Sequence, residues 1–361
     1  MFLYKHSNGV YYLYFKNEQD KRQKVSTRCT YKTDAMNFLH SFKRDEHERR
    51  LKAKHKLLSE FLTAFLSYAQ GSFSKGTVAI YKATLRNFIE YIGNFPLANY
   101  TPQHFDLYKT ERQKPVKVVT VKDGHTTEKE KMVKPVTVNI ELRTLRAFFN
   151  TAVRWKLLES NPFQIQLVKV PENKPTFLSK LEFQKLLNVI EEHWLKEVII
   201  FAVSTGLRRG ELVNLKWESV DLSRKLLYVE STPTFRTKAG RMRIIPLNDT
   251  ALYLLSQRDR QAKQGKDISG YVFSLNGKPL FANWITHLFK DYVREANLSN
   301  QDIHFHSLRH SFASWLAQDG TSVYVIKDLL GHSDVKTTQI YSHLQTESLH
   351  AEVNKISVSL N

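Results

Sequence analysis

The sequence is poor in the residues that form covalent cross-links and membrane spans. Cys29 is the only cysteine among the 361 residues, which excludes an intrachain disulfide and a cysteine zinc cluster. No apolar run approaches the roughly 20 residues that a membrane helix needs. Lys5, His6 and Lys16 interrupt the apolar N-terminal stretch, which therefore does not fit a signal peptide. We expect a soluble protein in a reducing, cytoplasmic compartment, with no membrane partner.

Acidic residues are also in short supply. The sequence contains 54 Lys and Arg but only 35 Asp and Glu, a formal net charge of +19. This surplus favours a polyanionic partner, first of all nucleic acid, and a basic protein whose charge only aids solubility is the alternative. Residues 1–173 carry 30 Lys and Arg against 16 Asp and Glu, whereas residues 174–361 carry 24 against 19. The N-terminal half is therefore predicted to grip backbone phosphates.

Residues 1–47 predict a small module of strands and one helix. Aromatic and β-branched residues at 10–15 follow the turn signal Asn8-Gly9. Residues 25–31 are expected to pair back after a basic turn, and a helix is expected to open at residues 33–34. The pattern indicates a sheet covered on one side by that helix.

Residues 57–165 predict a helical domain. Apolar residues recur at helical spacing from residue 57, with a break and an N-cap pattern at 74–77. Further helices are expected to begin near Pro102 and at residue 137, the last with Ile140 on its inward face. Residues 113–136 alternate valine with polar residues around an Asp-Gly turn signal and predict an inserted β-hairpin.

The remaining chain predicts a third domain after a linker. Residues 169–176 contain two prolines and no apolar periodicity. Ser179 and Glu182 then form a capping-box pattern. Strands are predicted at 226–229, 242–247 and 271–273, and helices dominate elsewhere. The predicted fold class is multidomain α+β: a small N-terminal β-sheet plus helix module, an all-helical domain, and a mainly α domain at 175–361 with a small antiparallel sheet.

Two segments of this last domain pair an arginine with a polar neighbour. Arg208 precedes a predicted helix, and Glu211, three residues on, shares its face and could orient it. His306 and Arg309 also lie three apart, which puts a proton-transfer group beside a phosphate clamp. A surface salt bridge is the plainer interpretation of Arg208 alone. Metal binding by His306 and His310 is disfavoured, because the arginine between them would repel a divalent cation.

A histidine and a tyrosine complete the set. His332 follows Gly331, where an apolar helix pattern ends, and Tyr341 comes nine residues later in a short amphipathic stretch. Taken singly, these residues are more simply an exposed cap and a core aromatic. Tyrosine has a pKa near 10, so it needs adjacent cations or a base to become a good nucleophile. Arginines and histidines gathered around it would supply both and would hold a phosphate for attack.

In their order along the chain, these segments resemble the signature boxes of the tyrosine recombinase (phage integrase) family. The matching sequences are TGLRRGEL at 205–212, HSLRH at 306–310, LLGHS at 329–333 and TTQIYSH at 337–343. The resemblance covers roughly residues 57–345 and implies a DNA strand-transfer enzyme that needs no metal, ATP or other cofactor. Consistently, the sequence has no G-x-x-x-x-G-K-[ST] nucleotide loop.

The resemblance also implies roles for single residues. Tyr341 is expected to attack the scissile DNA phosphate and form a 3′-phosphotyrosyl bond, while Arg208 and Arg309 hold the non-bridging oxygens. Lys238, between two predicted strands, is expected to protonate the leaving 5′-oxygen. Its rivals in the same loop are Arg236 and Arg241. Supporting roles are expected for His306 in proton transfer near the tyrosine, His332 in a phosphate hydrogen bond and Glu211 in holding Arg208.

By the same resemblance, residues 1–47 are similar to the arm-type DNA-binding domains of lambda-type integrases, 57–165 to a core-binding domain and 175–361 to a catalytic domain. A sheet that only completes the fold is the alternative for the first module. The hairpin at 113–136 departs from the usual core-binding pattern and is a candidate for an extra DNA or protomer contact. Candidate contacts with the DNA backbone are Lys21, Arg22, Lys24, Lys75, Lys82, Arg86, Arg143 and Arg146.

The implied partner is double-stranded DNA with attachment sites, bound by a homo-tetramer, with accessory DNA-bending or directionality proteins as further candidates. The expected purpose is integration or excision of a mobile element or prophage. Resolution or inversion by the same chemistry is one alternative, which the N-terminal sheet disfavours. A catalytically silent DNA-binding regulator is another, which the complete residue set disfavours. The tail after Tyr341 is expected either to pack on its own domain or to pass to a neighbouring protomer.

Overall fold

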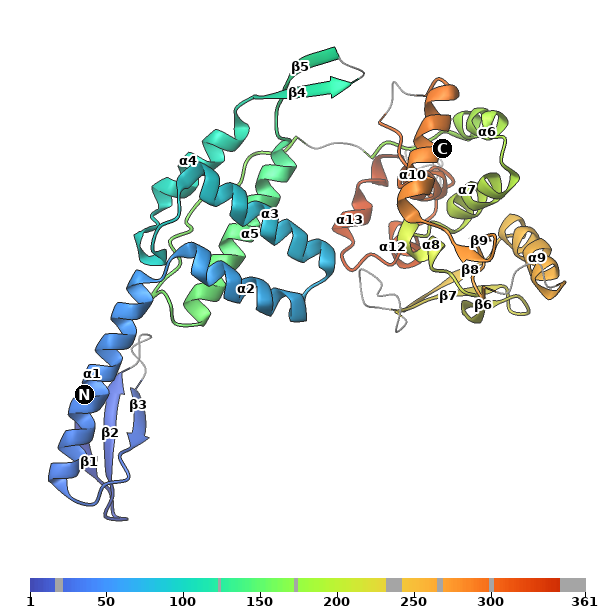
Figure 1. Ribbon diagram of the computed structural model, residues 1–361. Coiled ribbons are helices and arrows are strands. Elements are labelled where there is room, and N and C mark those ends of the chain that lie inside the picture. Colours follow the sequence, from blue (N-terminus) through green and yellow to red (C-terminus); the bar gives the residue numbers. More distant parts are fainter. Residues whose placement is uncertain are drawn as a thin grey trace, which may run out of the picture. The chain divides into compact units, whose positions relative to one another are not determined.

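The chain folds as two compact units, Met1–Pro171 and Glu172–Asn361, coloured from blue to green and from light green to red in Figure 1. The computed structural model describes residues 1–16, 22–122, 125–171, 175–231, 242–264, 269–298 and 302–344. For residues 46–54, 117–127 and 129, it gives no side-chain description. The boundary between the units falls inside the proline-containing segment 169–176. No helix in the described ranges is long and apolar enough to cross a bilayer.

The first unit begins with a three-stranded antiparallel sheet and a long helix. These elements are β1 (Phe2–Lys5), β2 (Tyr11–Lys16), β3 (Arg22–Ser26) and α1 (Lys32–His55). The strand order is β1-β2-β3, and α1 lies along the sheet (Figure 1). Leu13 on β2 is fully buried, and the ring of Phe15 lies 5.2 Å from that of Phe42 on α1. Alternate residues of β2 therefore anchor the helix.

The third strand lies earlier than the sequence predicted. Strand β3 covers Arg22–Ser26 and not residues 25–31, so Arg22 and Lys24 belong to a strand and not to a turn. The ammonium of Lys24 lies 5.7 Å from the centre of the Tyr12 ring. Strand β3 is at the edge of its sheet, where charged side chains are tolerated because solvent reaches them. The basic residues of this segment are therefore compatible with an edge strand, although they had suggested a turn.

A helical bundle and a hairpin make up the rest of the first unit. Its elements are α2 (Leu58–Ser72), α3 (Lys75–Ile92), η1 (Leu97–Asn99), α4 (Pro102–Gln113), β4 (Val116–Lys122), β5 (His125–Lys131) and α5 (Pro135–Arg154). Strand β4 pairs antiparallel with β5, within the range expected to form a hairpin. The predicted N-cap is confirmed, since Ser74 Oγ accepts a hydrogen bond from the Thr77 amide at 3.2 Å.

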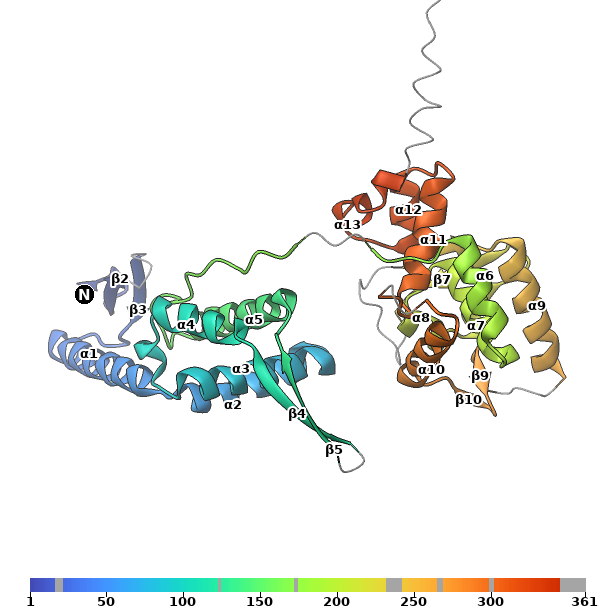
Figure 2. The same ribbon diagram turned by 90° about the horizontal axis from the view of Figure 1, so that it is seen from above.

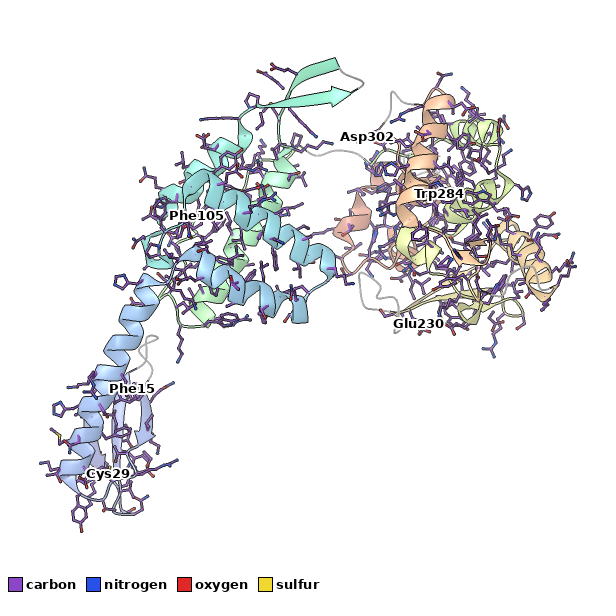
Figure 3. All side chains as sticks on the ribbon, viewed as in Figure 1. Phe15, Cys29, Phe105, Glu230, Trp284 and Asp302 are labelled. Atoms are coloured by element: carbon purple, nitrogen blue, oxygen red, sulfur yellow. The ribbon has the colours of Figure 1, made fainter. Side chains whose placement is uncertain are left out.

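Aromatic side chains fill the centre of the bundle. The rings of Phe61 and Phe148 lie 4.6 Å apart, and that of Phe105, labelled in Figure 3, stacks on Phe88 at 5.5 Å. One predicted core position is wrong: Ile140 on α5 is 39% exposed. The buried stripe of α5 runs through residues spaced by four and three, which places Ile140 on another face. The stripe is Val138, Leu142, Leu145 and Phe149.

The second unit is mainly helical with two small antiparallel sheets. Its helices are α6 (Lys180–Val189), α7 (His193–Thr205), α8 (Arg209–Val213), η2 (Trp217–Ser219), α9 (Asp249–Lys263), α10 (Ala282–Glu295), α11 (Ser307–Gln318), α12 (Val323–Leu330), α13 (Lys336–Gln339) and η3 (Ser342–Leu344). Its strands are β6 (Val220–Asp221), β7 (Leu226–Val229), β8 (Arg243–Pro246), β9 (Ser274–Leu275) and β10 (Lys278–Pro279). Strands β6, β7 and β8 form one sheet, and β9 pairs with β10.

Most predicted elements of this unit are confirmed, with one displaced strand. Ser179 and Glu182 form the expected capping box before α6. The strand predicted at 271–273 is wrong, because Tyr271 makes only an isolated bridge to Lys216 and the paired strand is β9. Val272 and Phe273 are buried against the main core, so their apolar character reflects packing and not strand pairing.

Helix α11 holds the centre of the second unit. It contacts both α7 and α12, and Figure 2 shows these helices together. Its Ser311 hydroxyl accepts the Leu178 amide at 2.8 Å, and its Trp315 indole donates to the Leu178 carbonyl at 2.9 Å. The segment that enters the unit is thereby fixed to the helix that carries Arg309.

Candidate active site

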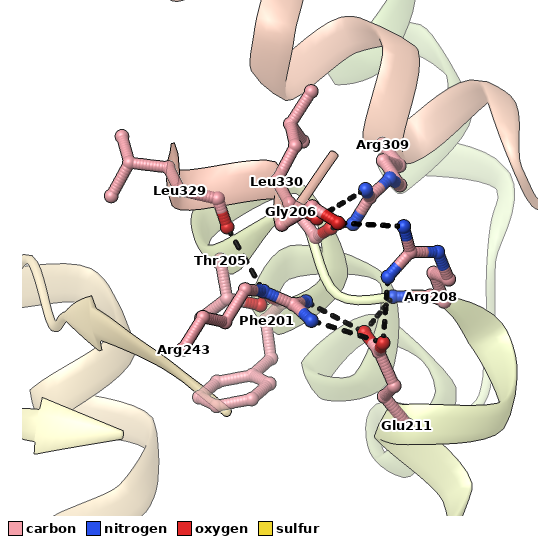
Figure 4. Close-up of polar contacts among 10 residues, drawn as sticks. Phe201, Thr205, Gly206, Arg208, Glu211, Arg243, Arg309, Leu329 and Leu330 are labelled. Carbon is pink, nitrogen blue, oxygen red and sulfur yellow. Dashed lines mark hydrogen bonds and ion pairs between the residues drawn. The ribbon is translucent and has the colours of Figure 1, made fainter. Parts of the chain in front are cut away.

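Helices α7 and α12 both end at a glycine in the left-handed conformation, and their last carbonyls meet two arginines. Gly206 has a φ of 63° and Gly331 a φ of 64°. Arg309 donates from Nη1 to the Gly206 carbonyl at 2.6 Å and from Nη2 to the Leu330 carbonyl (Figure 4). Arg208, the N-cap of α8, donates from Nη2 to the Gly331 carbonyl at 3.3 Å. Helix C-terminal carbonyls lack helical partners and carry negative partial charge, so they stabilise these cations.

A single carboxylate orients two guanidinium groups. Glu211, 5% exposed, accepts from Arg243 Nη1 at 3.0 Å and Nη2 at 2.7 Å, a two-pronged contact. It also accepts from the Arg208 backbone amide at 2.8 Å and from Arg208 Nη1 at 2.9 Å. Burial opposes ionisation of Glu211, but the hydrogen bonds and charge of Arg243, with those of Arg208, lower its pKa to about 2. Glu211 is therefore ionised at neutral pH and holds both arginines in place.

The cluster has more positive than negative charge. Arg208, Arg243 and Arg309 come together around the one carboxylate of Glu211 (Figure 4). Burial, and then the charges of Arg208 and Arg243, lowers the pKa of Arg309 to about 9. Arg309 thus remains protonated at neutral pH in a site that lacks its full counter-charge. Arg208 keeps 20% of its side chain exposed, so its planar fork can present donors to an arriving phosphate.

Arg243 is a residue of the site that the sequence interpretation missed. The sequence predicts only that Arg243 belongs to the strand at 242–247, and β8 does begin at Arg243. The signal was its register: Arg243 lies on the same face of β8 as Ile245, which is 1% exposed. Its Nε donates to the Leu329 carbonyl at 3.1 Å at the end of α12. An arginine at an inward-facing strand position needs such a partner, and that requirement could have marked it.

The tyrosine lies in the core next to α11. Tyr341 is 1% exposed, and its Oη lies 2.6 Å from Nδ1 of His310. Burial raises the pKa of Tyr341 to about 12, against the opposing influence of the Arg309 charge. The hydroxyl is therefore protonated at neutral pH. The structure thus joins the candidate nucleophile to His310, a histidine that the sequence interpretation had considered only as a metal ligand.

The other two histidines lie on the arginine side of the site. His332 shares a 2.8 Å hydrogen bond between its Nδ1 and Thr338 Oγ1. Burial, and then the charges of Arg309 and Arg208, lowers the pKa of His332 to about 4. His306 is the exposed N-cap of α11. Partial desolvation, and then His310 and Arg309, lowers its pKa as well. Both imidazoles are neutral at neutral pH.

The remaining predicted residues are distributed over the surface or lie outside the described ranges. Lys238, with its rivals Arg236 and Arg241, falls in the undescribed 232–241 segment between β7 and β8, and Lys21 also falls outside. All other candidate DNA contacts are exposed: Arg22, Lys24, Lys75, Lys82, Arg86, Arg143 and Arg146. Arg146 is partly occupied, since its guanidinium lies 5.0 Å from the centre of the Phe163 ring.

A metal centre has no support in the described part of the chain. No group of three or more His, Cys, Asp or Glu residues there is arranged to hold an ion. Of the two histidines considered as ligands, His310 has its Nδ1 against the Tyr341 hydroxyl, and Arg309 lies between the two in sequence. The arrangement instead brings a cluster of arginines near a buried phenol.

Comparison with known proteins supports this chemistry. Residues 176–348 match the model of the phage integrase family. Tyrosine recombinase XerD of Proteus mirabilis is 33% identical over 218 residues, which are 58% of this chain and 68% of XerD. The chain belongs to the tyrosine recombinase family.

Two solved structures share the fold of this tyrosine recombinase. The Tn1549 transposon integrase bound to transposon right-end DNA has a TM-score of 0.66 at 20% identity, covering 84% of this chain and 100% of that one. A lambda integrase dimer bound to a COC′ core site has a TM-score of 0.63 at 18% identity, covering 95% of each chain. The multidomain α+β fold is therefore that of the integrases.

Proposed function

We propose that this tyrosine recombinase cuts and rejoins DNA at specific sites through Tyr341. The observation that carries the proposal is the juxtaposition of a buried phenol with a cation cluster. The charge of Arg309 acts on the Tyr341 hydroxyl, and Arg309 is anchored together with Arg208 at the ends of α7 and α12. Arg309 and His310 are successive residues of α11, and His310 Nδ1 lies 2.6 Å from Tyr341 Oη, so we infer that a phosphodiester held by the arginines lies near the nucleophile.

The resemblance to the tyrosine recombinases supports the following reaction. The Tyr341 oxygen attacks the phosphorus, the bond to the 5′-oxygen breaks, and a 3′-phosphotyrosyl link preserves the energy of the phosphodiester. Arg208 and Arg309 neutralise charge that develops on the non-bridging oxygens, and His332 donates a hydrogen bond to one of them. Lys238 is the proposed acid that protonates the leaving oxygen. Because no bond energy is lost, attack by a 5′-hydroxyl of another strand reseals the DNA without ATP.

We assign the recombination to a mobile element or prophage. The N-terminal sheet and α1 precede the bundle. The lambda integrase match spans 95% of this chain, whereas the match to tyrosine recombinase XerA of Pyrococcus furiosus spans 84%. Arg22 and Lys24 lie exposed on an edge strand, where they can contact phosphates of a second DNA site. Exchange between two duplexes requires four cleavages, so the working assembly is a tetramer, with accessory DNA-bending or directionality proteins as further partners.

A covalent-adduct assay tests the nucleophile. The probe is a nicked duplex made from the DNA that flanks the gene, and the product is a protein–DNA adduct that survives denaturation. We expect Tyr341→Phe to lose the adduct and to keep salt-sensitive DNA binding. Tyr324→Phe is the matched control, because Tyr324 is 69% exposed on α12 and should retain full activity. An adduct that persists in Tyr341→Phe would place the nucleophile elsewhere.

A resolvase with the same chemistry is the second candidate, because relatives such as XerD, at 33% identity, are named tyrosine recombinases and not integrases. The same sites placed on one plasmid or on two separate plasmids distinguish the roles. An integrase is expected to join separate molecules, whereas a resolvase acts mainly within one. Binding without any adduct on either arrangement would indicate a silent DNA-binding regulator.

A further inference from the structure

His310 is the hydrogen-bond partner of the candidate nucleophile. Its Nδ1 lies 2.6 Å from Tyr341 Oη, and the tyrosine is 1% exposed in an apolar cluster with Ile326 and Leu330. His310 follows Arg309 directly on α11, and the two side chains meet different groups: Arg309 meets the carbonyls of Gly206 and Leu330, and His310 meets the phenol. One short stretch of helix thus fixes both the phosphate clamp and the attacking oxygen.

The ionisation states of this pair set the direction of the hydrogen bond. Burial, followed by His304 and Arg309, lowers the pKa of His310 to about 4, and burial raises the pKa of Tyr341 to about 12. At neutral pH a neutral hydroxyl therefore donates to a neutral imidazole, whose own proton is on Nε2. The titratable and charged groups facing His310 are His304, His306, Arg309, His332 and Tyr341.

We propose that His310 is a further catalytic residue, which orients Tyr341 and takes the hydroxyl proton onto Nδ1 as the oxygen attacks phosphorus. This inference rests on the proposed strand-transfer function. In the forward step the Oη–P bond forms, the P–O5′ bond breaks and the electron pair leaves on O5′, which is protonated by the proposed acid Lys238. In the reverse step a 5′-hydroxyl attacks phosphorus and gives its proton to Lys238, which the forward step left neutral. The P–Oη bond breaks, and His310 returns its proton to Oη.

The low basicity of His310 suits a proton transfer that accompanies bond formation. Before attack, the phenol is a far weaker acid than the imidazolium, so the pair stays neutral and no tyrosinate accumulates in the absence of DNA. As the oxygen bonds to phosphorus, it loses electron density and its proton becomes strongly acidic. The pKa of His310 therefore lies between that of the free phenol and that of the oxygen once it is bonded to phosphorus. Under this condition concerted general-base catalysis is effective. Phosphate bound nearby also favours the imidazolium electrostatically.

The other histidines are placed for different tasks. His306 is exposed, and its ring lies edge-on to that of His310 at 5.0 Å, so His310 stands nearer to the phenol in the described structure. His332 uses its Nδ1 for Thr338. The resemblance to the family implied that His306 assists proton transfer near Tyr341. The hydrogen bond instead favours His310 for the tyrosine proton and leaves His306 to the phosphate side, where Arg208 influences its pKa.

The test compares His310→Asn, His310→Ala and wild type in single-turnover adduct formation. Asparagine places a carbonyl oxygen near the former Nδ1, so it keeps the hydrogen bond to Tyr341 but takes no proton. The probe is the flanking-DNA duplex on which wild type forms an adduct. It is used in two forms, which carry either oxygen or sulfur as the bridging 5′ atom of the cleaved phosphodiester. Sulfur leaves without protonation, which separates loss of the base from loss of the acid. His287→Asn is the matched control, because His287 is exposed on α10.

We expect both His310 variants to react at least about 100-fold more slowly than wild type on both substrates. Lys238→Ala should recover on the sulfur substrate, and His287→Asn should be unaffected. DNA binding and the thermal unfolding midpoint of His310→Asn should match those of wild type. A His310→Asn rate within a few-fold of wild type, or recovery of that variant on sulfur, overturns the proposal. Absence of a wild-type adduct on every flanking duplex overturns strand transfer itself.

Histidine ¹⁵N NMR of the intact chain gives a second reading that does not require DNA cleavage. The proposal requires His310 to be neutral with its proton on Nε2, and its Nδ1 resonance to shift in Tyr341→Phe, where the donor is lost. A proton on Nδ1 in wild type would make His310 the donor, and it could not accept the tyrosine proton. That result overturns the proposal even if His310→Ala fails to fold.

Discussion

Glu211 shows how one buried side chain can organise an anion site. Its two oxygens accept from both Arg208 and Arg243, and each guanidinium then continues to a carbonyl at the end of α12. Removing one member of such a buried network leaves its partners without compensation, which costs more than the net worth of the contact. We therefore expect Arg243 to act on a bound phosphate only through Glu211 and Arg208, as a positioning residue.

Replacing Arg243 by lysine should weaken the site and leave the fold intact. Lysine retains the charge but not the two-pronged contact with Glu211, so we expect a loss of about 2 kcal/mol in the free energy of unfolding of the second unit. Adduct formation should fall about tenfold or more, because Arg208 loses its fixed orientation. Chemical denaturation and the covalent-adduct assay measure the two effects.

The matched control is Arg224→Lys, since Arg224 is 75% exposed and only 3.9 Å from Asp221 in a surface pair. Surface pairs of this kind contribute little, and the control should behave as wild type. Equal behaviour of Arg243→Lys and Arg224→Lys would show that the Glu211 contact does not position the site.

The spacing of residues along the chain predicted those contacts of the site that are local. Glu211 was expected to orient Arg208 because three residues separate them, and it accepts from Arg208 Nη1 at 2.9 Å. The contact of His310 with Tyr341 joins residues 31 positions apart. No periodicity links α11 to the segment after α13, so the sequence could not distinguish His310 from His306 as the partner of the tyrosine.

At the scale of elements, the C-terminal ends of α7 and α12 set the geometry of the site. Both helices stop at a left-handed glycine, and both glycines are tightly enclosed. A Cβ on Gly206 would lie 2.4 Å from Cδ1 of Phe312, and one on Gly331 would lie 2.6 Å from Cδ of Arg243. Glycine is therefore required here for backbone conformation and for close approach. The close approach lets the last carbonyls of α12 reach the guanidinium groups.

A comparison of Gly331→Ala with Gly277→Ala distinguishes the need for a left-handed backbone from the need for close approach. Gly277 has a similar φ of 71°, but its Cβ would have no neighbour within 4 Å. Both variants should lose about 1–2 kcal/mol of stability from the left-handed conformation. Only Gly331→Ala should also slow adduct formation, because Arg243 must move. Chemical denaturation measures the stability of both variants, and the covalent-adduct assay measures their activity. Equal activity of the two variants would contradict the close-approach argument.

Elements with a strong local signal were predicted well. The β7 and β8 strands follow from short apolar runs, and the α6 capping box follows from Ser179 with Glu182. The misplaced strands have a different origin. Strand β3 is an edge strand rich in charge, and the 271–273 segment is apolar because it is buried in the core. In both cases, tertiary environment and not local propensity decides the residue pattern.

At the scale of the whole molecule, the chain consists of two separately packed units. One apolar core is built from residues of the bundle and another from the second unit, and the boundary between the units lies at Pro171. The charge surplus is concentrated in residues 1–173, with 30 Lys and Arg against 16 Asp and Glu. The second unit carries the cation cluster and the tyrosine. We therefore expect the first unit to bind the DNA backbone and the second unit to carry the chemistry on one phosphate.

Removing the first unit should reduce the salt dependence of DNA binding. A fragment of residues 175–361 is expected to fold cooperatively on its own core, which circular dichroism can confirm. Each phosphate contact that is lost lowers the slope of the logarithm of affinity against the logarithm of salt concentration by about one. The full chain should therefore show the steeper slope in fluorescence anisotropy on the same duplex. Equal slopes would show that residues 1–173 do not contact the backbone.

The sequence alone indicated the family, because the order of its arginine, histidine and tyrosine segments resembles the signature boxes of the tyrosine recombinases. It also determined the helical and strand segments wherever local signals were strong. Only the tertiary structure decided which groups touch: Arg243 against Glu211, the arginines against the ends of α7 and α12, and Tyr341 against His310. These contacts join residues far apart in the chain, and their geometry depends on how α11 packs between helices.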